Sequence, residues 1–244
     1  MFGPALVIVC VVMAIAAGIV YRVSALGSPW VVPRAAVRGA IQLAAVATVL
    51  AAAMAHLWSS IAVLVVMFVV AAITAARRSH ASHGSAWLAV TLAIGLAAVL
   101  PLLLLSRVVP ATAVAIVPLF GIVLGGTMTA AAVAARRALD ALTARVGEVE
   151  AALSLGLSER DSRMEVIAQT VPDALLPNVD QARTAGLVAL PGAFVGVLLA
   201  TGSATQAGAV QVLVLISLLL SQTCAVALTG ELVARGRIRR DQQA

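Results

Sequence analysis

The residues of this chain whose side chains could take part in chemistry are a few polar groups inside long apolar segments. Amide, hydroxyl and thioether groups occur there at Gln42, Thr127, Met128, Thr129, Gln211 and Gln222. Such groups could contact a solute that crosses a membrane, but glutamine and threonine also pair neighbouring helices. Both interpretations stay open. No carboxylate lies in the middle of an apolar segment, so the hard oxygen ligands typical of divalent cations are not evident and any metal ligands are unknown.

A second feature is the mixed-charge segment 136–183, which holds eight of the ten acidic residues. Within it, four residues follow the spacing E-A-A-x-x-x-G, namely Glu150, Ala151, Ala152 and Gly156. One charged segment in an otherwise apolar chain indicates a membrane subunit that docks onto a cytoplasmic partner. The alternative is a surface helix that simply ends at a glycine.

Enzymatic and nucleic-acid functions are not indicated. The chain has no G-x-x-x-x-G-K-[S/T] phosphate loop, so we expect no ATP hydrolysis, no catalytic residues and no cofactor in this chain. The net charge is +6, but no basic stripe is interleaved with aromatic residues, which argues against nucleic-acid binding.

The elements that position these residues are predicted to be membrane-spanning helices. Hydrophobic residues make up 62% of the chain and charged residues 11%, and uncharged runs extend over 39–76 and 184–230. A helix needs about 20 apolar residues to cross a bilayer. With breaks near His56–Ser60 and Thr201–Gly208, we expect an all-α membrane protein with about seven transmembrane helices: 3–21, 36–56, 60–76, 86–106, 111–135, 184–201 and 208–231.

Arginine placement predicts the orientation. All sixteen basic residues are arginine, and with these seven spans only Arg107 falls on one side of the membrane. Basic loops stay in the cytoplasm, so the N-terminus is predicted outside and the C-terminus inside. With this orientation the 136–183 segment becomes a cytoplasmic loop.

That loop is predicted to contain two helices. An apolar stripe of three- and four-residue steps continues from the preceding span through Leu139, Leu142, Val146, Val149 and Leu153. Gly156 is expected to stop the first helix, and Ser158 with Asp161 to cap the second. Pro172 then ends the second helix.

These residues carry a resemblance. The E-A-A-x-x-x-G spacing resembles the coupling motif of ABC-transporter permeases, which inserts into a cleft of the ATPase subunit. Three further stretches resemble the bacterial iron-export permease (FetB-like) family, which is related to plant aluminium-tolerance permeases. These stretches are Arg34–Leu43, Pro118–Met128, and Leu176-Pro177 followed by Thr184–Gly192. The chain departs from the family at Gly126, where an asparagine is usual, at Asp180, also usually asparagine, and near Ala47, where a glycine is usual.

The resemblance implies a single permease domain over residues 1–244 and a separate cytoplasmic ABC ATPase that binds ATP and Mg. It also implies a permease homodimer in the lipid bilayer, with a bacterial inner membrane as the expected location. Glu150, Ala151, Ala152 and Gly156 would form the docking elbow. Gly121 with Gly125, and Gly192 with Gly196, would allow close helix contact. Pro191 with Gly192 would kink the sixth span, as a hinge or as a purely structural bend.

The function we expect is export of a metal ion such as iron. Two alternatives stay open, an ABC permease for a small organic solute such as a nucleotide sugar, and a seven-helix channel-like protein without an ATPase. The sequence leaves open the solute, the transport direction and the number of subunits.

Overall fold

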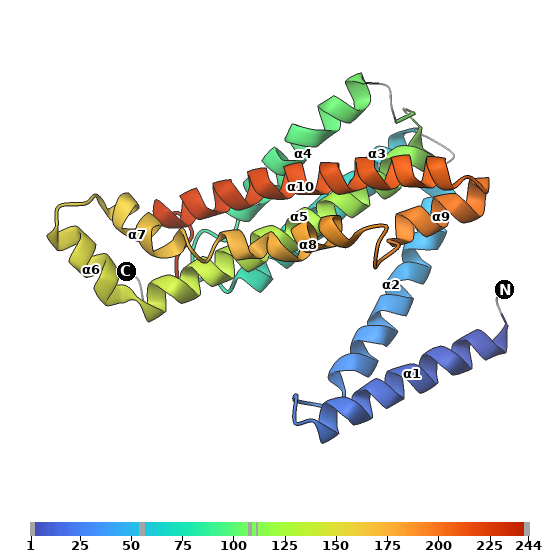
Figure 1. Cartoon of the computed structure of the whole chain (residues 1–244), viewed down its shortest axis with the longest axis horizontal. Coiled ribbons are helices and arrows are strands. Elements are labelled where there is room, and N and C mark those ends of the chain that lie inside the picture. The colour runs from blue at the N-terminus through green and yellow to red at the C-terminus, as the bar shows by residue number, and fades with distance from the viewer. Residues whose placement is uncertain (1–2, 54–56, 107–108, 111, 242–244) are drawn as a thin grey trace. The chain divides into compact units, whose positions relative to one another are not determined.

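The computed structural model describes residues 3–53, 57–106, 109–110 and 112–241 (Figure 1). These residues form ten α-helices and one short 3-10 helix, which confirms the predicted all-α class. The chain divides into two compact units, residues 1–60 and 61–244. Two residues of the sequence prediction lie outside the described residues: His56, where the predicted break His56–Ser60 begins, and Arg107.

The first unit contains α1 (Pro4–Val23) and α2 (Val31–Ala53), which pack against each other. Proline at the first position of α1 is favourable, because a helix leaves that N–H without a partner in any case. Gly18 makes the contact possible, since a Cβ there would lie 2.9 Å from the carbonyl oxygen of Pro29.

The second unit is built around α5 (Ala113–Ala144) and α10 (Ala204–Ala234), which run side by side (Figure 1). Helix α4 (Trp87–Leu105) packs against both, and α3 (Leu57–Ser79) precedes it in the chain. The buried face of α5 consists largely of alanines, which let helix backbones approach closely. These are Ala130, Ala131, Ala134, Ala135 and Ala138, each at most 2% exposed.

The described part of the chain contains five helices that are long and apolar enough to cross a membrane. They match the predicted spans 3–21, 60–76, 86–106, 111–135 and 208–231; their bounds are Pro4–Val23, Trp58–Ser79, Trp87–Leu105, Ala115–Ala144 and Ala204–Ala234. The predicted span 36–56 falls mainly in α2, which carries Arg34 and Arg38 near its start and is not among the five. The count of seven spans therefore stays a prediction.

The predicted span 184–201 was wrong in extent. A short helix α8 (Leu176–Thr184) ends at Thr184, and the chain turns at Gly186, whose φ is +83°. Helix α9 covers only Gly192–Thr201, ten residues, which is about 15 Å and half the thickness of the hydrocarbon core. Pro191 is the N-cap of α9 with extended backbone, so it precedes the helix and does not kink it.

Two short helices of the charged segment lie at one end of α5 and α10 (Figure 1). Helices α6 (Val146–Ser154) and α7 (Glu159–Ile167) pack against each other as a hairpin, residues 146–167. A 3-10 turn, η1 (Pro172–Ala174), then leads into α8.

Candidate functional site

The α6–α7 hairpin begins at a break in the helix that comes from α5. Arg145 has φ −121° and ψ 39°, which ends α5 at Ala144 and redirects the chain into α6. The predicted apolar stripe from Leu139 to Leu153 is therefore interrupted at Arg145. Leu142 before the break is 6% exposed, whereas Val146 after it is 55% exposed. One guanidinium holds the break in place, because Arg145 Nη2 donates to the carbonyl oxygen of Val166 at 2.7 Å.

The turn between α6 and α7 follows the sequence prediction. Gly156 has φ +92°, which L side chains rarely adopt, and its N–H donates to the carbonyl of Leu153 at 2.9 Å. Ser158 caps α7, since its Oγ accepts from the backbone N–H of Asp161 at 3.1 Å. The Ser158 hydroxyl also donates to the Asp161 carboxylate at 2.7 Å. With Arg160, this bond lowers the pKa of Asp161 below its ordinary value.

The residues of the E-A-A-x-x-x-G spacing lie together on this hairpin. Glu150, Ala151 and Gly156 are exposed, and Ala152 is half-buried. Among the described residues, the carboxylate of Glu150 has no ion-pair partner, whereas Glu148 and Glu159 each pair with an arginine. An unpaired carboxylate beside two alanines is available to another protein. The docking role of the four residues stays a prediction.

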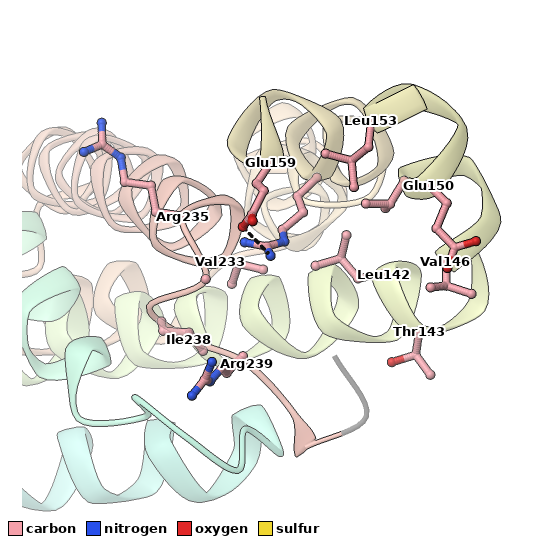
Figure 2. A pocket seen from close by; sticks show the side chains of 13 residues that line it. Leu142, Thr143, Val146, Glu150, Leu153, Glu159, Val233, Arg235, Ile238 and Arg239 are labelled. Carbon is pink, nitrogen blue, oxygen red and sulfur yellow. Dashed lines mark hydrogen bonds and ion pairs between the residues drawn. The ribbon is translucent and has the colours of Figure 1, made fainter. Parts of the chain in front are cut away.

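A pocket of about 530 Å³ lies behind the hairpin, here called the elbow pocket (Figure 2). Apolar side chains from α5 and α6 form one wall, so the predicted stripe lines a cavity. The C-terminal segment after α10 forms the other wall with Ile238 and Arg239. The apolar lining residues include Leu142, Val146, Val149, Leu153 and Val233.

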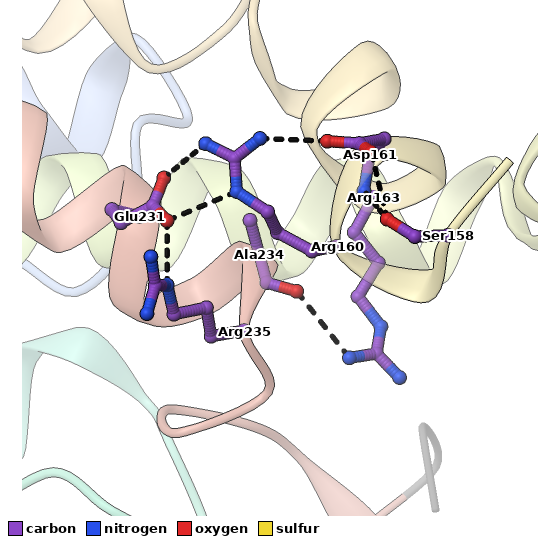
Figure 3. Close-up of polar contacts among 7 residues, drawn as sticks. All are labelled: Ser158, Arg160, Asp161, Arg163, Glu231, Ala234 and Arg235. Carbon is purple, nitrogen blue, oxygen red and sulfur yellow. Dashed lines mark hydrogen bonds and ion pairs between the residues drawn. The ribbon is translucent and has the colours of Figure 1, made fainter.

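Glu231 near the end of α10 connects that helix to the hairpin (Figure 3). Its carboxylate accepts two bonds from Arg160 of α7, from Nε at 3.0 Å and from Nη2 at 2.6 Å. Arg235, one turn further along α10, donates to the same carboxylate at 2.6 Å. We call these three residues the Glu231 cluster. The two bonds that Arg160 donates to Glu231 also raise the pKa of Arg160 above its ordinary value.

Arg163 makes a second connection between hairpin and α10. Its Nη1 donates to the carbonyl oxygen of Ala234 at 3.4 Å, and its Nη2 pairs with Glu159 at 3.0 Å. A Cβ on Gly236 would lie 2.8 Å from Arg163 Nη1, so the chain passes close to this guanidinium where it leaves α10. The hairpin is therefore attached to the end of α10 at two points.

The C-terminal segment continues to the loop between α3 and α4. The backbone N–H of His83 donates to the carbonyl of Arg239 at 3.1 Å, and Arg239 returns a bond to His83 at 3.2 Å. Arg240 donates to the carbonyl of His80 at 2.9 Å. Gly84 is required here, since a Cβ would lie 1.7 Å from the carbonyl oxygen of Arg237.

Polar groups meet where α4, α5 and α10 pack together. The hydroxyls of Thr127 and Ser221 are 2.7 Å apart, and both residues are fully buried. Gln222 is also fully buried, and neither atom of its amide has a hydrogen-bond partner among the described residues. Thr127 and Gln222, two predicted pathway residues, thus lie in the same helix interface.

The other predicted pathway residues lie elsewhere. Met128 is half-buried against the apolar core, and Thr129 is exposed, with its hydroxyl bonded to the carbonyl of Gly125 at 3.0 Å. Gln42 is exposed in the first unit. Gln211 is 6% exposed, and its Oε1 accepts the backbone N–H of Phe194 at 3.1 Å. This bond satisfies an otherwise unpaired amide in the first turn of α9.

Only part of the predicted glycine packing is present. A Cβ on Gly121 would lie 2.9 Å from Met67 Cε, but a Cβ on Gly125 or Gly192 would meet nothing within 4 Å. The close approach in α5 instead involves Gly126, where a Cβ would lie 2.5 Å from Leu218 Cδ2.

Gly95 of α4 is a packing residue that the sequence analysis missed. A Cβ there would lie 2.7 Å from the carbonyl oxygen of Ser221. The sequence signal for this packing role is that Gly95 lies in the middle of a long apolar run. Within the described part of the chain, no group of three or more His, Cys, Asp or Glu side chains could hold a metal ion.

Comparison with known proteins identifies the family. Residues 4–237 match the "Uncharacterised protein family (UPF0014)". The rice protein "UPF0014 membrane protein STAR2" (Oryza sativa subsp. japonica) is 33% identical over 150 residues, covering 61% of this chain and 53% of the rice protein. "Protein ALUMINUM SENSITIVE 3" of Arabidopsis thaliana is 29% identical over 150 residues, 61% of this chain and 55% of the plant protein.

A bacterial relative has a more specific name. "Probable iron export permease protein FetB" of Escherichia coli (strain K12) is 28% identical over 166 residues, 66% of this chain and 63% of that protein. The matched part is thus half to two thirds of the length of these three relatives. No solved structure matches. The resemblance to the iron-export permease family is confirmed, and this multi-pass membrane protein belongs to the UPF0014 family.

Proposed function

We propose that this chain is the membrane permease subunit of an ABC transporter that exports a metal ion such as iron, with ATP hydrolysis on a separate subunit. The observation that carries the proposal is the α6–α7 hairpin, which is bonded to α10 through the Glu231 cluster. It presents Glu150 to solvent, without an ion-pair partner among the described residues. The name of the E. coli relative, "Probable iron export permease protein FetB", supports the choice of solute.

The proposed mechanism begins at the hairpin. An ATPase that closes on ATP and Mg pushes the docked hairpin, which includes Ala151, Ala152 and Gly156. Because Arg160 and Arg163 bond to Glu231 and Ala234, the displacement reaches the end of α10. Helix α10 packs along α5 and α4, so a shift of α10 alters the interface around Thr127 and Gln222. Two arrangements of this interface would give alternating access.

The proposal includes a topology and an assembly. The hairpin end of α5 and α10 faces the cytoplasm, with the N-terminus outside, as the positive-inside rule predicts. A bacterial inner membrane is the proposed location. Two copies of this chain, each with one ATPase, form the transporter.

An organic solute is the second candidate, because the buried groups are neutral. The Gln222 amide offers two donors and an acceptor that are unused among the described residues, and the Thr127–Ser221 pair adds hydroxyls. Such groups suit the polar atoms of a nucleotide sugar as well as a metal ion that is bound through neutral oxygens. In either case the chain is a permease.

The test is reconstitution of this chain with a cytoplasmic ABC ATPase from the same genome, in lipid nanodiscs. ATP hydrolysis is measured while ferrous iron, other divalent metals and nucleotide sugars are titrated in turn. We expect hydrolysis to rise with one metal. A response to a sugar alone would replace the metal with the organic solute. An ATPase that never associates with the chain would leave the channel-like alternative.

A further inference from the structure

A second pocket lies between the end of α3 and the middle of α5. It measures about 310 Å³ and is here called the arginine pocket, lined by Arg78, His80, Thr129, Ala132, Val133 and Arg136. The four residues from α5 recur at steps of three and four, so they share one helix face about 10 Å long. Arginine lies at one end of this face and the threonine hydroxyl at the other.

The two arginines of this pocket are not neutralised by any carboxylate among the described residues. Among the described residues, neither Arg78 nor Arg136 has an ion-pair partner. The adjacent Arg137 is different, because it pairs with Asp173. The nearest carboxylate along α5, that of Asp140, is bonded to Arg240 at 2.6 Å. Two uncompensated guanidinium groups across a small pocket favour a bound anion, and phosphate matches their planar, forked donors.

The backbone at the mouth of the pocket is held in place. His80 has φ +56°, an uncommon conformation for a residue other than glycine. The bond from Arg240 to its carbonyl oxygen fixes this turn, and Ser79 Oγ accepts from the N–H of Ala81 at 3.3 Å. The turn that follows Arg78 is therefore fixed by the C-terminal segment.

The wall of the pocket identifies the source of the phosphate. Thr129, Ala132 and Val133 belong to the membrane-spanning part of α5, and all of the pocket lies toward the hairpin end of that helix. A free phosphate ion would use the arginines alone, whereas a phospholipid places its headgroup there and its glycerol and acyl chains along the apolar wall. Basic pockets between membrane helices bind anionic headgroups in this way.

We propose that the arginine pocket binds the phosphate group of an anionic membrane lipid between α3 and α5. This site is separate from the Glu231 cluster and from the buried interface of Thr127 and Gln222, and Thr129 is the one predicted pathway residue that lines it. It requires that the chain spans a membrane, but it does not depend on the ATPase or on the transported solute.

The test measures lipid retention by native mass spectrometry of the full chain, released from detergent micelles that contain phosphatidylglycerol or phosphatidylcholine. We expect one phosphatidylglycerol to remain bound to the wild type in preference to phosphatidylcholine. Arg78→Gln and Arg136→Gln are each expected to weaken this binding about fivefold, and the double variant about 30-fold, from the attraction that each arginine contributes near an anionic headgroup. Arg77→Gln is the matched control, since it removes the same charge one residue away from the pocket lining.

The outcomes separate the sources of the anion. Equal losses in Arg77→Gln and Arg78→Gln would overturn the proposal, because general surface charge would then explain the binding. Retention of both lipids to the same degree would also overturn it. A competition on the wild type needs no variant. If inorganic phosphate at millimolar concentration displaces phosphatidylglycerol, the pocket is a free-anion site and the lipid assignment is wrong.

Discussion

The buried amide of Gln222 leads to an unusual prediction, that replacing a buried side chain raises the stability of the protein. Neither amide atom has a partner among the described residues, and the side chain is fully buried. A buried polar group without a hydrogen bond costs about 1–3 kcal/mol. Methionine has nearly the same length and volume, and exchanges of this kind cost under about 1.5 kcal/mol. We therefore expect Gln222→Met to stabilise the protein by about 1–2 kcal/mol.

Gln211 of the same helix provides the matched control. It is also buried, but its Oε1 accepts the N–H of Phe194 at 3.1 Å. Gln211→Met removes that bond and leaves a first-turn amide of α9 unpaired, which costs about 1 kcal/mol. The same chemical change in α10 is thus expected to stabilise at residue 222 and to destabilise at residue 211.

The assay is thermal unfolding of both variants and the wild type in one detergent, followed by intrinsic fluorescence. For a chain of this length, one kcal/mol corresponds to about 2–4 °C in the midpoint. The reasoning is refuted if Gln222→Met lowers the midpoint as much as Gln211→Met does. If Gln222 contacts the solute, Gln222→Met should also reduce transport while it raises stability.

Three further predictions concern the hairpin and the C-terminal segment. Gly84→Ala should release the C-terminal segment, because the new Cβ would overlap the carbonyl oxygen of Arg237. We expect faster tryptic cleavage after Arg237 and Arg239. Unchanged cleavage would count against the contact. Gly156→Leu should strain the turn by about 1–2 kcal/mol, since φ is +92° there, and should weaken ATPase copurification without loss of membrane insertion. Arg160→Glu should let ATP hydrolysis continue while transport falls, and adding Glu231→Arg should restore transport; no restoration would mean that the pair does not transmit the motion.

The fold was predictable wherever apolar runs are long and uncharged. The helices at 4–23, 87–105 and 204–234 follow directly from such runs. The run at 184–230 misled the prediction, because uncharged residues 185–191 form a turn at Gly186 and Pro191 instead of a helix. Charge and hydropathy cannot distinguish a turn of small apolar residues from a span.

The local features of the hairpin were also predictable, and its tertiary contacts were not. The stop at Gly156 and the cap at Ser158 depend on neighbours within three residues. The bond between Arg160 and Glu231 joins residues 71 positions apart. Nothing in a single sequence indicates which of the sixteen arginines would reach that carboxylate. The break at Arg145 was missed because the apolar spacing continues across it.

The central claim is that the α6–α7 hairpin docks onto an ATPase through Glu150. The most direct measurement is copurification of a cytoplasmic ABC ATPase with the wild type, with Glu150→Arg and with Asp180→Arg. The last variant makes the same charge change on α8, outside the hairpin. The account predicts that the ATPase elutes with the wild type and with Asp180→Arg and is lost from Glu150→Arg. Equal ATPase recovery with all three proteins would contradict it.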